Sequence, residues 1–558
     1  MTNTGAHSRR DPWPIAFLCL LGAMLALDIG YFLLVSRPDS LLGVPMADST
    51  VYLQLAEELR SGGAAAHSVF YWSPLYTVLL ALLTRFGAAP VILLQLAAGL
   101  GTLGLVFVIA SRQGSSRAGF FAALVLALYA PFLMQQTKLV PVTFAVLFSL
   151  IGIGLTLHAM ANSGSRTSKS AASIPHSASR IPHFVSGLCF GAAGLLMPQL
   201  LLAPVLVGFH LLFGRDRSRG NRILLLAAGV LVAVLPITIR NAVVGHDFVP
   251  VSSSAGYNLY LGFHPNGTGL IGRPREMTEF TVDGRNLLTV KEQEEFQRRF
   301  AEQELGHELK PSAVSGFWAR RSLKFITQQP GRALRQLVNK LEFSLTSYEF
   351  ANSYYPEIER ALAWPLKVAF LPWALLFGLA IASIVLTWPR RSALWPLYVL
   401  PLAVLISLLL FFVNSRYRLP AVPPMAILAG LGIDAALKDR RRRLAGAGIA
   451  LLAIVISGPV LRAAAAQHIR FDEAYGWRNF NINAQRLGHD ELALNLLDRS
   501  TRLMAVSPRG PRTAAQYDDL AQAYLALGNR FLDRKNPVYA RRAYDSALQM
   551  TPVSPRPG

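Results

Sequence analysis

Long apolar runs alternate with short polar segments along most of the chain. Roughly 20 consecutive apolar residues cross a bilayer as a helix, and by that rule the sequence predicts about eleven membrane spans. They are expected at residues 14–35, 89–111, 118–134, 140–160, 184–197, 199–213, 222–239, 362–387, 394–413, 420–437 and 444–461. The expected fold is therefore a mainly α-helical, polytopic membrane protein.

Basic residues in the short connecting segments indicate the orientation of these spans. Lys and Arg accumulate in every second segment, and such segments stay in the cytoplasm. The basic positions are Arg112, Arg117, Arg166, Lys169, Arg180, Arg215, Arg217, Arg219, Arg222, Arg390, Arg391, Lys438 and Arg440 to Arg443. We therefore expect a cytoplasmic N-terminus and an extracytoplasmic position for residues 36–88, 240–361 and 466–558.

Changes in hydropathy and residue composition divide the chain into four expected parts. They are an N-terminal transmembrane module with a first extracytoplasmic loop, an extracytoplasmic domain, further transmembrane helices and a polar helical tail. Their bounds are 1–239 (with the loop 36–88), 240–361, 362–465 and 466–558. In the extracytoplasmic domain, β-prone pieces and turns up to about residue 262 precede three helical patterns, at about 290–309, 312–329 and 331–347.

The tail repeats small and aromatic residues at helical spacing. The second unit has Tyr517, Leu520, Ala521, Tyr524, Gly528, Ala540, Tyr544, Ala547 and Pro552, and a weaker first unit has Leu487, Gly488, Ala493, Leu497 and Pro508. Apart from a few extra residues after Gly528, these positions match a tetratricopeptide repeat. Because such repeats stabilise one another by stacking, we expect this short tail to pack on the membrane part, pair with a second copy or bind a partner protein.

Composition supports a membrane protein and argues against other classes. The 558 residues are 52% hydrophobic and 15% charged, which is too apolar for a soluble multidomain protein. The net charge of +22 lies mostly in the segments that orient the spans, so no nucleic-acid partner is expected. Cys19 and Cys189 both fall in apolar runs and offer neither a disulfide framework nor a thiolate metal site.

Asp48 is the candidate catalytic residue of the first extracytoplasmic loop. It precedes a run in which Tyr52, Ala56 and Leu59 repeat at helical spacing, so it lies near a helix N-terminus that favours an ionised carboxylate. An ordinary helix cap would explain an Asp in this place. If Asp48 instead serves chemistry, we expect it beside a cavity that Tyr52, one turn further on, also lines.

Four basic residues lie in outward segments, against the topology signal. They are Lys138, Arg240, Arg416 and Arg418. Snorkelling towards lipid head groups explains many single cases of this kind. Four cations on the face that holds Asp48 favour an anion site instead, and we expect at least one of them within several ångströms of its carboxylate.

These segments resemble the GT-C membrane glycosyltransferases, in particular the bacterial branch related to protein mannosyltransferases and lipid A aminoarabinose transferases. The resemblance covers about residues 14–437. It rests on Asp48 followed by Tyr52 and Ala56, on Pro74-Leu75-Tyr76, on Arg240-Asn241 before Phe248-Val249-Pro250-Val251-Ser252 and Asn258-Leu259-Tyr260-Leu261-Gly262, and on Arg416-Tyr417-Arg418-Leu419-Pro420. It implies a GT-C-like fold in a bacterial inner membrane, as part of the cell envelope.

The resemblance also implies an activity. A sugar would move from a polyprenyl-phosphate donor to a hydroxyl of a protein, lipid or glycan at the extracytoplasmic face, with Asp48 as base and inversion at the anomeric carbon. One carboxylate suffices for the acceptor proton, and fixed cations suffice for the leaving phosphate. Lys138, Arg240, Arg416 and Arg418 would bind that phosphate, and Tyr52, Asn241 and Tyr417 would position substrate. No metal ligands are assigned, and a requirement for a divalent cation is left open.

Two positions depart from the family pattern and keep an alternative open. Many relatives carry an acidic residue close to Lys138, where this chain has Gln135, Gln136, Pro141 and Val142, and Met197-Pro198 stands where Arg-Pro is common. The alternative is a non-catalytic scaffold, in which a degenerate transferase body uses the tail to bind proteins. A transporter should hold several ionisable residues near mid-membrane, and Asp28 is the obvious one here.

Overall fold

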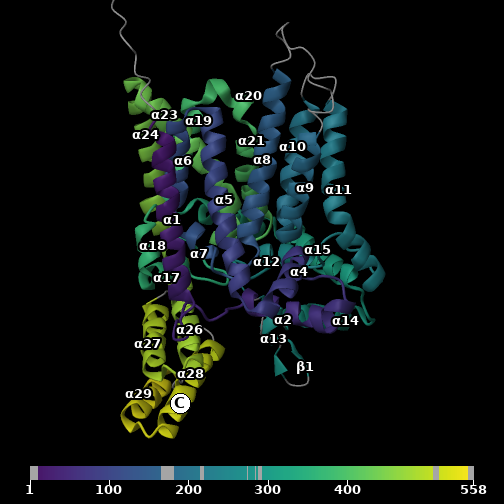
Figure 1. The fold of residues 1–558 in the computed structure, drawn as a ribbon. Helices are drawn as coiled ribbons and strands as arrows, with labels where there is room; N and C mark the ends of the chain where they lie inside the picture. Colours follow the sequence, from purple (N-terminus) through teal and green to yellow (C-terminus); the bar gives the residue numbers. More distant parts are fainter. Residues whose placement is uncertain are drawn as a thin grey trace, which may run out of the picture.

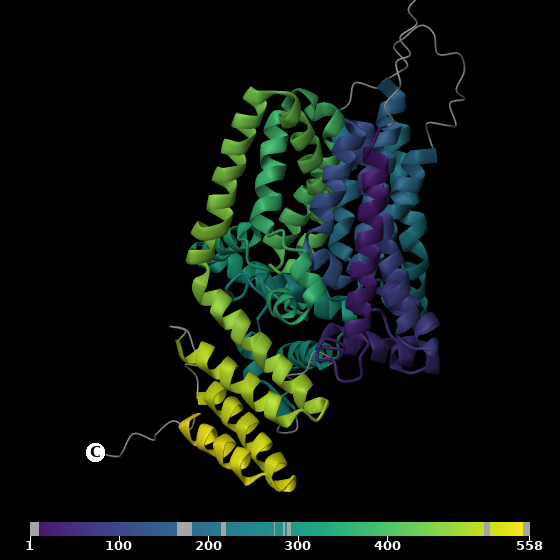
Figure 2. The ribbon, with the colours of Figure 1, turned by 60° about the vertical axis from the view of Figure 1, so that its left-hand side comes forward.

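Long parallel and antiparallel helices form a bundle, and shorter helices and the tail gather at one end of it (Figure 1). The computed structural model describes residues 11–164, 181–213, 219–272, 274–282, 285–286, 292–506 and 514–550. Helix α1 (Trp13–Val35) begins at the end of the bundle opposite the tail (Figures 1 and 2). The α20 segment (Arg391–Leu394) lies at that same end, and the orientation across a membrane stays a prediction.

Six described helices are long and apolar enough to cross a membrane. They are Trp13–Val35 (α1), Ala89–Gln113 (α5), Val142–Ala161 (in α8, Val142–Gly164), Arg219–Val244 (α11), Ser415–Lys438 (α22 to α23) and Arg440–Ala464 (α24 to α25). Each coincides with a predicted span. The predicted span at 362–387 overlaps the end of α17 (Pro356–Leu362), α18 (Trp364–Val368) and α19 (Trp373–Leu386), and α19 forms with Trp388–Leu394 a helix pair bent by 74°.

The other four predicted spans coincide with shorter apolar helices. These are α6 (Ser116–Ala127), α9 (Ile181–Leu196), η3 with α10 (Pro198–Leu212) and α21 (Pro396–Leu410). By length and composition, six or seven of the described helices can span, so the predicted number of about eleven is not confirmed. Proline accounts for one break: Met197 takes an extended conformation before Pro198, because a residue before proline is kept out of the helical region.

The first extracytoplasmic loop is helical. It contains α2 (Asp48–Ser61), the single turn α3 (Ala64–His67) and α4 (Pro74–Leu83). The first of these helices packs against the third. Asp48 therefore begins a helix that is held in place by its own loop.

The segment after α11 forms a helical layer towards the end of the bundle that carries the tail (Figure 1). It comprises α12 (Ala255–Gly262), α13 (Arg275–Glu279), α14 (Gln293–Leu305), α15 (Pro311–Gln328), α16 (Pro330–Leu345), α17 (Pro356–Leu362) and α18 (Trp364–Val368). Three of these helices, α14 to α16, match the three predicted helical patterns. Strands β1 (Thr281–Val282) and β2 (Arg285–Asn286) form a two-residue hairpin.

The sequence predicts β-prone pieces up to about residue 262, and this prediction is wrong for the last piece, which is helical. Residues 255–262 form α12, in which Tyr257, Tyr260 and Leu261 face one core together with Trp318. Their spacing of three and four residues suits a helical face, so burial of that face overrides the β preference of tyrosine.

The tail consists of two helical hairpins. Helix α26 (Ala466–Arg486) pairs with α27 (Asp490–Val506), and α28 (Ala514–Asp533) pairs with α29 (Pro537–Met550). In the second hairpin a Cβ at Gly528 would lie 2.5 Å from the ring of Tyr544, so only glycine allows this approach. Pro508, Pro552 and the side chain of Tyr517 lie outside the described residues, and the tetratricopeptide assignment stays a prediction.

Helix α23 (Val422–Lys438) anchors the centre of the bundle. Its residues from Val422 to Gly432 are all buried, and Gly430 lies so close to α6 that a Cβ would be 2.4 Å from the carbonyl oxygen of Ala118. Small residues allow such close packing between membrane helices. The chain enters this fixed helix through α22 (Ser415–Arg418), which carries two of the four predicted cations.

Candidate functional site

Asp48 and Arg416 form a buried ion pair between residues 368 positions apart in the chain. Nη2 of Arg416 donates to Oδ2 of Asp48 over 2.6 Å, and both side chains are 9% exposed. A short, charge-assisted bond of this kind is stronger than a bond between neutral groups. The structure therefore brings one of the four predicted cations directly to the candidate base.

Asp48 does not occupy the N-cap position of α2. That position is Ala47, which has φ 40° and ψ −110° and no side-chain cap. A positive φ is strained for a residue that carries a β-carbon, and such strain persists only where the surroundings impose it. Ordinary capping therefore does not account for the placement of this carboxylate, which meets Arg416 instead.

Arg416 keeps one buried nitrogen without a partner. Among the described residues, its Nη1 makes no hydrogen bond, although the side chain lies almost entirely inside the protein. The ring of Tyr417 lies 5.4 Å from the guanidinium carbon. An unsatisfied buried N–H costs about 1–3 kcal/mol. This nitrogen is therefore suited to an oxygen atom of a bound anion.

The turn that presents Arg416 is fixed from both sides. Asn414 caps α22, since its side-chain oxygen accepts from the backbone N–H of Tyr417 at 2.9 Å. The backbone N–H of Ser415 donates to the carbonyl oxygen of Phe350 at 2.7 Å. The position of Arg416 thus depends on the segment around Phe350 as well as on α23.

Tyr52 lies in a buried aromatic cluster one turn after Asp48. Its hydroxyl donates to Oγ of Ser73 at 2.8 Å, and its ring meets the rings of Trp72 and Tyr76 edge-on at 5.5 and 5.1 Å between centroids. Burial raises the pKa of Tyr52, so the hydroxyl stays protonated. The role of Tyr52 and Tyr417 in positioning substrate stays a prediction.

Lys138 pairs with a carboxylate that the sequence did not indicate. Its Nζ lies 2.8 Å from Oε2 of Glu359, with side chains 2% and 0% exposed, and also donates to the carbonyl oxygen of Leu42. Tyr31 donates its hydroxyl to the same carboxylate. A buried acid thus neutralises Lys138 in the folded protein, and its role in binding the donor phosphate stays a prediction.

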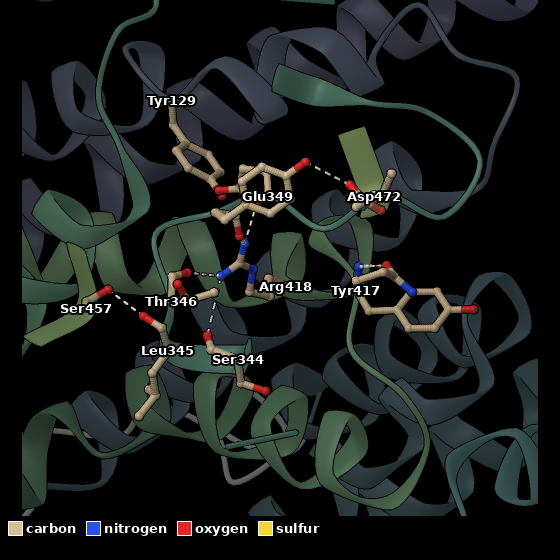
Figure 3. Close-up of polar contacts among 12 residues, drawn as sticks. Tyr129, Ser344, Leu345, Thr346, Glu349, Tyr417, Arg418, Ser457 and Asp472 are labelled. Atoms are coloured by element: carbon tan, nitrogen blue, oxygen red, sulfur yellow. Dashed lines mark hydrogen bonds and ion pairs between the residues drawn. The ribbon is translucent and has the colours of Figure 1, made fainter. Parts of the chain in front are cut away.

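Arg418 is also neutralised by a buried acid (Figure 3). Its Nη2 lies 2.6 Å from Oε2 of Glu349, and the guanidinium donates to carbonyl oxygens of Thr346 and Tyr348 at 2.9 and 2.7 Å. Glu349 accepts a further hydrogen bond from Tyr129 at 2.6 Å. At 1% exposure, Arg418 holds the segment 344–349 in place, and its role in binding the donor phosphate stays a prediction.

Arg240 and Asn241 fasten loops together. Arg240 donates to the carbonyl oxygens of Ala65, Ala66 and Ser68 and stacks on the ring of Phe70 at 4.1 Å. Asn241 is fully buried, and its amide donates to the carbonyl oxygens of Val249 and Val251 while accepting from the N–H of Phe70. The structure thus places this pair in the support of the first loop and not against Asp48.

Sequence reasoning missed both compensating acids, Glu349 and Glu359, and also Tyr354. The hydroxyl of Tyr354 donates to Oγ of Ser49 at 2.6 Å, while its ring lies 4.7 Å from Nζ of Lys138. All three residues lie in the polar and aromatic stretch just before the apolar run at 362. No cluster of metal-binding side chains occurs within the described ranges.

Comparison with known proteins gives low-identity structural likenesses. No family model matches the sequence, and the search of curated proteins finds no match. The structure is similar to the apo oligosaccharyltransferase of Archaeoglobus fulgidus, with TM-score 0.44, 15% identity and coverage of 98% of this chain and 60% of that one. It is also similar to ArnT from Cupriavidus metallidurans bound to undecaprenyl phosphate, with TM-score 0.40, 14% identity and coverage of 95% and 75%.

A third similar structure is the oligosaccharyltransferase AglB of Archaeoglobus fulgidus with an inhibitory peptide and a dolichol-phosphate, at TM-score 0.38, 13% identity and coverage of 90% and 59%. This chain thus spans about 60% of the length of the archaeal enzyme.

Proposed function

We propose that this protein is a membrane glycosyltransferase that moves a sugar from a polyprenyl-phosphate donor to a hydroxyl acceptor at the extracytoplasmic face. The observation that carries the proposal is the buried pair of Asp48 and Arg416. It joins a carboxylate, which can accept a proton, to a guanidinium with an unpartnered nitrogen, which can hold a phosphate oxygen.

The reaction follows from these two groups. The acceptor hydroxyl gives its proton to the Asp48 carboxylate while its oxygen attacks the anomeric carbon of the donor. The bond from that carbon to the phosphate oxygen breaks, and the phosphate monoester leaves with the electron pair. Arg416 stabilises the charge that develops on the leaving oxygen. Attack opposite to the leaving group inverts the configuration of the sugar.

Lys138, Arg240 and Arg418 each have structural partners, so we assign the proposed phosphate site to Arg416. Lys138 and Arg418 are each bound to a buried carboxylate, and Arg240 is occupied by three backbone carbonyls. Adding a phosphate beside an acid that already neutralises its cation is unfavourable, since like charges repel. Arg416 also shares its guanidinium with an acid, and both its Nη1 and the Nε of Arg418 lack a partner; Arg416, at 8% exposure against 1%, is the less enclosed of the two.

Mass spectrometry of the purified protein, together with two substitutions, tests the proposal. We expect a polyprenyl-phosphate sugar to copurify with the natural chain. Asp48→Asn should keep that lipid but lower transfer by roughly 100-fold or more, as loss of a general base does. Arg416→Ala should weaken binding of farnesyl phosphate by about 1.5–3 kcal/mol, and Arg416→Lys should restore only part of it.

The control is Asp439→Asn, at the cap of α24, where the side chain accepts from the N–H of Arg441. Asparagine caps a helix as well as aspartate does, so transfer and lipid content should not change. Full transfer by Asp48→Asn would contradict the mechanism and favour the scaffold alternative.

A further inference from the structure

Helix α26, the first helix of the tail, lies against two segments that lead to the site. It runs under the bundle next to α17 (Figures 1 and 2). Its Asn483 donates to the carbonyl oxygen of Leu41, which is in the loop before Asp48, and its Asn479 donates to the hydroxyl of Tyr355 at 2.7 Å. The tail is therefore joined to the membrane part through side chains on one face of this helix.

The approach is so close that it requires a glycine. A Cβ on Gly476 would lie 2.4 Å from the side chain of Ile358 and 2.6 Å from the ring of Tyr355. Any larger residue would push α26 away from α17. Side chains of α17 and of the residue before it therefore lie directly against the backbone of α26 at Gly476.

Asp472 makes the contact that reaches furthest into the site. Its Oδ2 accepts from the hydroxyl of Tyr348 at 2.9 Å and lies 3.4 Å from the N–H of Ala351 (Figure 3). Tyr348 is 1% exposed. One carboxylate of the tail therefore holds both ends of the segment 348–351.

That same segment holds α22. The carbonyl oxygen of Tyr348 and the carboxylate of Glu349 accept from Arg418, and the carbonyl oxygen of Phe350 accepts from the N–H of Ser415. Arg416 lies between these two anchored residues. Hydrogen bonds thus run from Asp472 through residues 348–351 to Ser415 and Arg418, the residues that flank Arg416 in the chain.

We propose that Asp472 is a positioning residue of the site, through which the tail holds Arg416 in place against Asp48 and towards the donor phosphate. This inference rests on the proposed function in one respect, that Arg416 binds the donor. A protein that binds the tail and moves α26 would therefore change donor affinity, and donor binding would change the affinity for that protein by the same factor.

Hydrogen exchange of the full-length protein in detergent, read by mass spectrometry, tests the contact directly. Asp472→Ala should speed amide exchange in residues 348–351 and 414–418. It should also weaken farnesyl phosphate binding roughly two- to tenfold, the range for one lost hydrogen bond. Asp472→Asn keeps an acceptor of the same shape and should restore both readings. Gly476→Leu, which leaves Asp472 unchanged, should act like the alanine variant.

The matched control is Asp498→Ala in α27. Asp498 also accepts from a tyrosine hydroxyl, that of Tyr524, but within the tail. It should leave exchange in residues 414–418 and farnesyl phosphate affinity unchanged. Unaltered exchange and affinity in both Asp472→Ala and Gly476→Leu would overturn the inference. If exchange responds as expected but the natural chain binds no farnesyl phosphate, the contact stands and the proposed function fails.

Discussion

Three basic residues near the site are each paired with a buried acid, and they differ in how enclosed they are. Arg416 meets Asp48 with its side chain 9% exposed, whereas Lys138 and Arg418, paired with Glu359 and Glu349, are 2% and 1% exposed. The sequence indicated the first pair, because both residues stood out as polar groups in outward segments. It did not indicate the other two pairs, because each acid comes from a stretch far along the chain whose folding the sequence alone does not show.

We expect Glu359→Gln to destabilise the protein by about 3–5 kcal/mol, because it leaves the Lys138 ammonium buried and unpaired. The double variant with Lys138→Met should recover much of that loss, since it removes the stranded charge. Denaturant unfolding in detergent measures both. A Glu359→Gln variant that unfolds like the natural chain but has lost transfer would instead place Glu359 in the chemistry.

At the scale of elements, apolar periodicity predicted the long helices well and predicted their interruptions poorly. The span expected at 362–387 is divided among α17, α18 and α19, and the one at 118–134 ends at Ala127 before α7 (Ala130–Gln135). Prolines 131, 365 and 372 lie at these breaks, where they cannot donate a helical hydrogen bond. Hydropathy averages over such positions, so a broken helix and a straight one give the same signal.

Helix α16 meets the end of α21 through a buried lysine. Nζ of Lys340 donates to the carbonyl oxygen of Leu409, in the last turn of α21, and lies 3.4 Å from the centre of the Phe263 ring. A cation at a helix C-terminus is favourable. Burial nevertheless lowers the pKa of Lys340 to about 7, because the charged form is desolvated.

This lysine should make stability depend on pH in a defined window. Between pH 7 and about 10, the unfolded chain binds a proton at this residue that the folded chain lacks, so stability should rise with pH, by up to about 1.4 kcal/mol per unit. Lys340→Met should remove that part of the slope. Unfolding free energies of both proteins at pH 7.5 and 9.5 give the comparison, and equal slopes would contradict the assignment.

At the scale of the whole molecule, the tail packs against the membrane part of the protein. The sequence predicted a separate helical unit and offered packing on the membrane part as one of three outcomes. The structure shows α26 against the loops at one end of the bundle. The sequence does not distinguish these three outcomes, because Asn479, Asn483 and Asp472 make the contacts through polar side chains. Polar residues on a helix are equally typical of a face that is exposed to solvent.

Docking of the tail should weaken as pH rises from about 4 to 7. Burial raises the pKa of Asp472 to about 7, so the docked state binds a proton that the free tail releases. Glu357 and Glu473 lie near Asp472, and burial raises their pKa values too, so they add to the pH dependence of docking. Arg462 opposes this rise of the pKa for both glutamates. Burial also raises the pKa of Tyr348, so its hydroxyl stays a hydrogen-bond donor. Exchange rates in residues 348–351 at pH 5 and 7.5, corrected for intrinsic exchange, measure it. Asp472→Asn should flatten the dependence, and an unchanged slope would remove Asp472 as its source.

The backbone of Ala47 has a consequence for the energetics of recognition. A residue with φ 40° costs of the order of 1–3 kcal/mol, and the packing of the surrounding fold offsets that cost. The loop that presents Asp48 is thus set in its shape when the chain folds. An incoming lipid does not have to order that loop, so more of the contact energy it gains is expressed as affinity.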